Sequence, residues 1–126
     1  MGWIEIGLAD GRTAYRPGEE VAGAVAWSLE DGAPPERAEV RLVWFTRGKG
    51  ERDSGVAATE ELPSPAALDR RDFRLRLPEG PYSFTGKVVS IAWAVEVVVE
   101  PGERTERTEI VVSPTGRPIE PRPAPG

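Results

Sequence analysis

The stretch from Phe73 to Val99 constrains the fold more than any other part of the sequence, because it holds two strand patterns separated by a turn. From Phe73 to Leu77 apolar residues alternate with arginines, which is the period of a strand with one buried and one solvated face. Two prolines and a glycine in residues 78–81 then interrupt the ladder. Residues 89–99 place an apolar side chain at every second position, Trp93 among them. We predict that this segment is the central strand of a β-sandwich, with Trp93 in the core.

The rest of the chain shows short segments with the same alternation. Strands are expected over residues 4–8, 21–29, 38–45 and 108–112, with weaker signals near Tyr15 and over residues 55–59. Asp10-Gly11 is a strong hairpin signal, since both turn positions favour a positive φ. Residues 60–70 lack periodicity, and we expect a mobile loop there. No capped helical period is present, so the prediction is an all-β, immunoglobulin-like β-sandwich of about eight strands.

Composition argues against catalysis and metal binding. The chain has no histidine and no cysteine, which removes the commonest general base, the thiolate nucleophile and the commonest transition-metal ligands. Neighbouring carboxylates at Glu19/Glu20 and Glu60/Glu61 do not converge in a cleft as acid–base chemistry requires. We therefore expect no catalytic residue, no cofactor and no metal site.

Charge and hydropathy exclude two further classes of partner. A net charge of −5 opposes binding to nucleic acid or to anionic lipid. No apolar run approaches the length of about 20 residues that a membrane span needs. The N-terminus lacks the basic and apolar regions of a signal peptide, so a cytoplasmic location is expected.

The C-terminal end differs in composition from the rest. Residues 114–126 are rich in proline and are predicted to form an extended tail after a single domain over residues 1–113. Pro118-Ile119-Glu120-Pro121 fits a PxxP ligand pattern, although a proline-rich unstructured terminus produces the same match.

Several short motifs resemble those of the arrestin-like domains. An opening of Tyr-x-Pro-Gly-Glu-x-Val-x-Gly is followed by a strand ending in Leu-Pro, a proline, Ser-aromatic-x-Gly and a long strand with Trp among valines. In this chain they are Tyr15–Gly23, Leu77-Pro78, Pro81, Ser83–Gly86 and Ile91–Val95. The resemblance spans residues 3–113 and implies an arrestin-like β-sandwich acting as a non-catalytic protein-binding or scaffold module. Trafficking adaptors and bacterial sporulation-control proteins share this pattern. Arrestins have two domains where this chain has one, so no individual binding residue carries over.

Two stripes of small residues form the candidate interface. Strand faces exposed to water usually favour larger polar residues, whereas these are almost all alanine or serine. The stripes are Ala22, Ala24, Ala26 and Ser28 on one strand, and Ser90, Ala92 and Ala94 on another. If the two strands are neighbours, the stripes make a flat patch for a protein partner or for self-association.

The tryptophans supply an alternative function. Trp27, Trp44 and Trp93 share the parity of large residues in their strands and are predicted to be core residues. Trp3 has the opposite parity to Ile4 and is predicted to be exposed. An exposed indole with nearby loops would suit a sandwich that binds a small ligand, a sugar or an anion.

Overall fold

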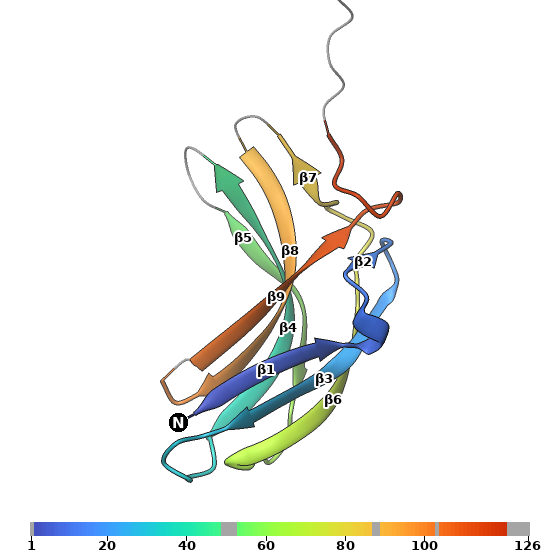
Figure 1. Cartoon of the computed structure of the whole chain (residues 1–126). Helices are drawn as coiled ribbons and strands as arrows, with labels where there is room; N and C mark the ends of the chain where they lie inside the picture. The colour runs from blue at the N-terminus through green and yellow to red at the C-terminus, as the bar shows by residue number, and fades with distance from the viewer. Residues whose placement is uncertain (1, 49–52, 87–88, 103, 121–126) are drawn as a thin grey trace, which may run out of the picture.

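The computed structural model describes residues 2–48, 53–86, 89–102 and 104–120, which form strands joined by turns (Figure 1). The strands pack as two sheets, which confirms the predicted all-β sandwich. The elements are β1 (Trp3–Leu8), a 3₁₀ turn η1 (Ala9–Gly11), β2 (Ala14–Tyr15), β3 (Glu20–Ser28), β4 (Arg37–Gly48), β5 (Ser54–Glu61), β6 (Leu68–Arg76), β7 (Phe84–Thr85), β8 (Val89–Glu100) and β9 (Arg104–Val112).

The two sheets differ in size. The small sheet has the order β1-β3-β6, and the large sheet has the order β2-β9-β8-β4-β5 with β7 also paired to β8. Strand β8 pairs with β4 along its whole length and with β9 on its other side. It is therefore the central strand of the large sheet, as its sequence pattern predicts.

The turn after β1 carries the chain from the small sheet to the large sheet, and it corrects an expectation. Asp10 and Gly11 have the predicted positive φ, 57° and 66°. The flanking strands nevertheless do not form a hairpin, because β1 pairs with β3 while β2 pairs with β9. Tyr15 is buried in the core, and its strand is held by a bond from Ser113 N to Tyr15 O of 3.0 Å. Burial of this side chain and a ladder on the other sheet outweigh the local preference of the turn.

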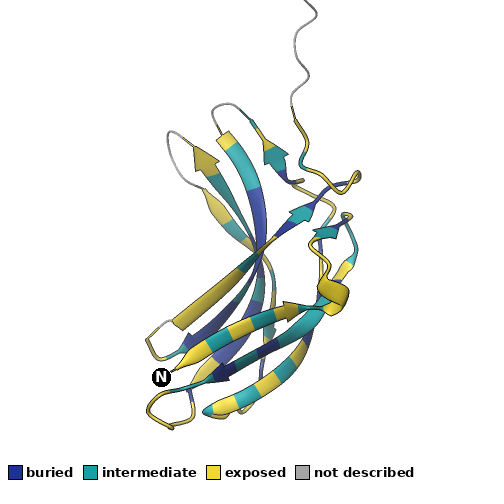
Figure 2. Cartoon of the chain, viewed as in Figure 1, coloured by how far each residue is buried: buried dark blue, intermediate teal, exposed yellow. Residues whose placement is uncertain are grey.

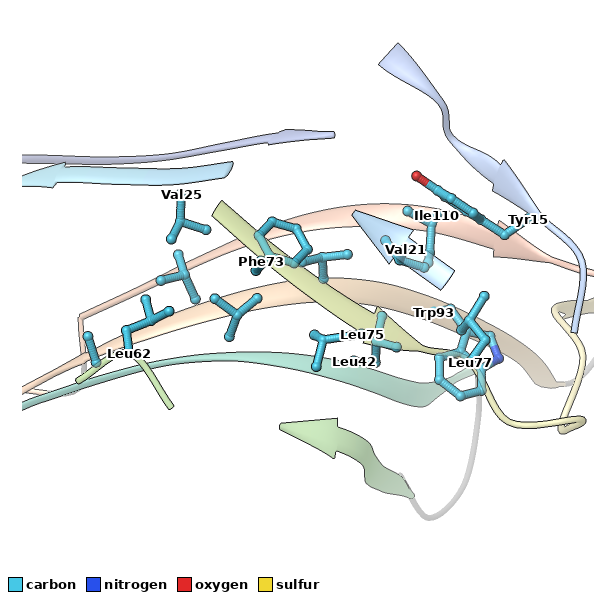
Figure 3. Packing of buried hydrophobic residues seen from close by; sticks show 14 of the residues in the cluster. Tyr15, Val21, Val25, Leu42, Leu62, Phe73, Leu75, Leu77, Trp93 and Ile110 are labelled. Carbon is cyan, nitrogen blue, oxygen red and sulfur yellow. The ribbon is translucent and has the colours of Figure 1, made fainter. Parts of the chain in front are cut away.

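The core lies between the sheets and combines aliphatic and aromatic side chains from both (Figure 3). Trp27 and Trp93 are fully buried, as predicted. Each indole N–H finds a carbonyl, Ala66 O at 2.7 Å for Trp27 and Pro81 O at 2.9 Å for Trp93. Trp44 is only partly buried and packs against the edge of the core. Trp27 and Trp93 are thus shielded from water with their indole N–H groups hydrogen-bonded, as buried tryptophans usually are.

The irregular segment expected over residues 60–70 is shorter than predicted. Strand β5 continues to Glu61 and β6 begins at Leu68, so only residues 62–67 connect them. Asp69 accepts bonds from Arg71 Nε and from the backbone N of Ala66, at 2.9 and 2.8 Å. Arg71 in turn donates to the carbonyls of residues 63 and 64. This clamp fixes a connection that has no periodic pattern of its own.

The first part of the predicted tail lies against the domain. Ile119 forms a parallel bridge with Phe84. Its N–H donates to Ser83 O and its carbonyl accepts from Thr85 N, both at 2.9 Å. Residues 121–126, and with them the second proline of the PxxP pattern, lie outside the described residues.

The Asp69–Arg71 clamp predicts a pH-dependent stability. The Arg71 guanidinium, with the amides of Ala66 and Arg70, holds the pKa of the Asp69 carboxyl below its usual 3.8 in spite of desolvation. A lowered pKa stabilises the fold above the unfolded-state value, and that stability is lost as pH falls through the folded-state value. We expect Asp69→Asn to lower the free energy of unfolding by about 2 kcal/mol at neutral pH. The difference from wild type should narrow below pH 3.8 in urea titrations.

Asp72→Asn is the matched control, because the Asp72 side chain is 81% exposed and its one ion pair among the described residues is with Arg70. It should behave like wild type throughout. A deficit in Asp69→Asn that is equally large in acid and at neutral pH would contradict the clamp.

Candidate interaction surface

The two predicted stripes do not form one patch. Ala22, Ala24, Ala26 and Ser28 lie on β3 of the small sheet, and Ser90, Ala92 and Ala94 lie on β8 of the large sheet. Both stripes have the parity opposite to the core residues of their strands, so they face away from the core on opposite sides of the sandwich. The condition for a continuous patch, that the strands be neighbours, is not met.

On the large sheet the stripe is covered. Ala92 and Ala94 are buried, 7% and 0% exposed, so their predicted exposure is wrong. Ala92 pairs with Phe45, and two guanidinium groups lie over the Phe45 ring, those of Arg47 at 5.0 Å and Arg107 at 4.8 Å from its centroid. The alanines leave room for these long side chains to lie flat across the sheet. Parity predicts their face correctly but not what covers it.

Charged residues complete this cover, which we call the arginine–glutamate layer. Its members are Arg37, Glu39, Arg41, Arg47, Glu96, Arg107 and Glu109. Glu39 is only 2% exposed, and both Arg37 and Arg41 donate to its carboxylate. Glu96 accepts from Arg107 at 2.7 Å, and Arg47 pairs with Glu109 at 2.5 Å. Each arginine of this layer is paired with one of its glutamates, so these charges are engaged with one another rather than free to bind a ligand.

On the small sheet the stripe remains accessible. Its residues lie in rows with side chains of the flanking strands. Exposed positions alternate with partly buried ones on β1 and with partly or fully buried ones on β6 (Figure 2). We define the small-sheet face as these outward residues: Trp3, Glu5 and Gly7 on β1, Ala22, Ala24, Ala26 and Ser28 on β3, and Leu68, Arg70, Asp72 and Arg74 on β6.

The small-sheet face has large apolar side chains at one end. Trp3 and Leu68 lie on either side of Ser28 and are 44% and 70% exposed. The exposure of Trp3 confirms the prediction from its parity. Leu68 was not identified from the sequence, because it stands alone after a segment of serine, proline and alanine and falls within the expected loop. Two large exposed apolar side chains flanking small residues are the composition of a contact surface.

Three other kinds of site bear on function: a ligand pocket, a metal site and a membrane span. A shallow hollow of about 600 Å³ opens between the starts of β1 and β9, with Trp3, Glu30 and Arg104 in its wall. The described residues contain no cluster of three or more acidic side chains that could hold a metal ion. Within the same residues, no helix is long and apolar enough to cross a membrane.

The sheet order, a three-stranded sheet packed on a six-stranded sheet, defines an all-β sandwich of the class expected from the sequence. Among solved structures, the chain is similar to the sporulation control protein Spo0M from Bacillus subtilis, with a TM-score of 0.66 and 19% identity. The match covers 89% of this chain and 49% of the Spo0M chain, so this chain spans about half of that protein's length. No protein-family model matches the chain. No curated protein matches it in sequence. At this identity the likeness establishes the fold alone.

The difference between the two stripes gives a direct test. Ala92→Lys places a charge beside Phe45 at a buried position, and we expect a loss of about 1–3 kcal/mol in the free energy of unfolding. Ala24→Lys, on the open small-sheet face, should change that free energy by no more than about 0.5 kcal/mol. Urea unfolding followed by circular dichroism measures both. Equal stability of the two variants would show that the arginine–glutamate layer does not seal the large sheet.

Proposed function

We propose that the chain is a non-catalytic protein-binding module that holds its partner on the small-sheet face. The observation that carries this proposal is the exposure of Trp3 and Leu68 on either side of an accessible row of small residues. Aromatic side chains are frequent energetic anchors of protein interfaces. Ser28 between Trp3 and Leu68, and the alanines in the neighbouring rows of β3, allow another backbone to approach closely. The absence of histidine and cysteine from the sequence supports binding over catalysis.

The likeness to Spo0M supports a regulatory role that acts through protein binding. That protein is described as a sporulation control protein, which suggests regulation through contacts rather than through a reaction. This chain corresponds to about half of Spo0M, so only a single interaction module is proposed for it. The arginine–glutamate layer is the less suitable face, because its charged groups are already paired.

Capture from an extract of the source organism tests the module directly. Wild-type protein immobilised through its C-terminus should retain a partner that Ala24→Lys loses, because lysine holds the two surfaces apart. Val56→Lys is the matched control, since Val56 is 55% exposed but lies on β5 of the large sheet. The variants are compared by mass spectrometry of the captured proteins. Retention of every captured protein by Ala24→Lys would refute the role of this face.

The hollow beside Trp3 favours a second candidate function, binding of a small sugar or anion. Trp3 offers an exposed ring and Arg104 a cation in the same hollow. Trp27 and Trp93 are fully buried, and the partly buried Trp44 does not line this hollow, so quenching that depends on Trp3 would report on a ligand bound there. We expect saturable quenching by a monosaccharide or by inorganic phosphate that disappears in Trp3→Phe. A titration without saturation in wild type would remove this candidate.

A further inference from the structure

We propose that the small-sheet face binds a second copy of this chain, face to face, about a two-fold axis that runs along β3. The inference rests on the proposed function, since it takes the same face as the docking surface and specifies its occupant. It is derived from the register of the three strands and from the charges that the register places on them.

The register makes the face self-complementary. Strands β1 and β6 both run antiparallel to β3 and therefore parallel to each other on its two sides. A two-fold axis along β3 places β1 of one subunit over β6 of the other, with rows at the same level. Trp3, in the row of Ser28, then faces the partner's Leu68. Glu5, in the row of Ala26, faces the partner's Arg70. Because of the two-fold symmetry, each of these contacts occurs twice in the dimer.

The other way of stacking the same face brings like charges together. A two-fold axis perpendicular to the strands would put β1 on β1 and β6 on β6. Centred on the row of Ala26, it stacks Glu5 on the partner's Glu5 and Arg70 on the partner's Arg70. Centred on the row of Ala24, it stacks Arg70 on the partner's Arg74. Like charges in direct opposition disfavour both of these arrangements. Centred midway between the two rows, the perpendicular axis pairs Arg70 with the partner's Asp72, but it places Leu68 on the partner's Arg74 and Glu5 on the partner's Gly7. The axis along β3 is therefore favoured, because it alone pairs Glu5 with a cation and Trp3 with an apolar side chain.

Net charge also favours this face for contact between copies. The whole chain carries −5, so two copies repel each other on average. The charged members of the small-sheet face are Glu5, Arg70, Asp72 and Arg74, two acidic and two basic, which sum to zero. Gly7 leaves open space where a side chain would stand, since a Cβ there would meet nothing within 4 Å. That space lies opposite the partner's Asp72 in the proposed arrangement.

The size of the face predicts a weak dimer. Three strands about 4.8 Å apart and seven residues long at about 3.4 Å per residue cover roughly 350 Å² per copy. Stable complexes bury about 800 Å² per partner, so the dimer should form only at high protein concentration. Sedimentation velocity from about 10 µM to about 1 mM spans the range for an interface of this size.

Charge reversal at one pair gives a test that folding defects cannot imitate. Glu5→Arg alone and Arg70→Glu alone should each stay monomeric across this range, because their homodimers would oppose like charges. Mixed in equal amounts, the two variants form a heterodimer in which both pairs are complementary. We expect the mixture to associate at least tenfold more tightly than either variant alone, and less tightly at high salt.

Glu36→Arg is the control, since Glu36 is exposed and lies outside the small-sheet face; this variant should associate as wild type does. Thermal melts establish that every variant is folded. A wild type that stays monomeric at about 1 mM, or a mixture no more associated than its components, overturns the inference. If Ala24→Lys then still loses a captured protein, the face docks a different protein and the proposed function stands.

Discussion

Burial of β8 on both of its faces is the constraint on which the rest of the structure depends. Its inward residues, such as Trp93 and Val97, meet the small sheet across the core, while Ala94 and Val98 are buried on the opposite side. A strand that is dry on both sides needs a second cover besides the core. No third layer of backbone provides it among the described residues. Long side chains from β4 and β9 take its place, and their charges must then be paired with one another, which accounts for the alternation of arginine and glutamate.

This cover makes the two outer faces of the sandwich unequal. The large sheet presents paired charges over small, buried residues, and replacing Glu109, for example, removes the partner of Arg47. The small sheet has no comparable layer, because β1 contributes only a glutamate, a glycine and a tryptophan to its outer face. A domain built this way has one surface committed to its own stability and one available for contacts. The proposed difference in role between the two outer faces follows from the length of their outward side chains, which are long on the large sheet and short on β3 of the small sheet.

The sequence predicts most of the fold, since alternation with a period of two reports directly which side chains share a face. It identifies β8, the burial of Trp93 and the exposure of Trp3 for this reason. It wrongly predicts that Ala92 is exposed, because the parity of one strand does not report which side chains of neighbouring strands cover it. It also fails to pair β2, since a turn such as Asp10-Gly11 determines local geometry and not the sheet that the next strand joins. Leu68 was missed because a single apolar residue at a strand start has no period.

The bridge between Ile119 and Phe84 has a consequence for how this domain can be joined to anything else. It holds Ile119 beside β7, and this strand and the start of β1 lie at opposite ends of the sandwich (Figure 1). A polypeptide attached at Gly2 would start beside Trp3 and shield that corner. One attached after Glu120 would leave the same corner clear. The two ends of the domain are therefore not equivalent for a fusion: one fusion covers Trp3, and the other leaves Trp3 free for contacts.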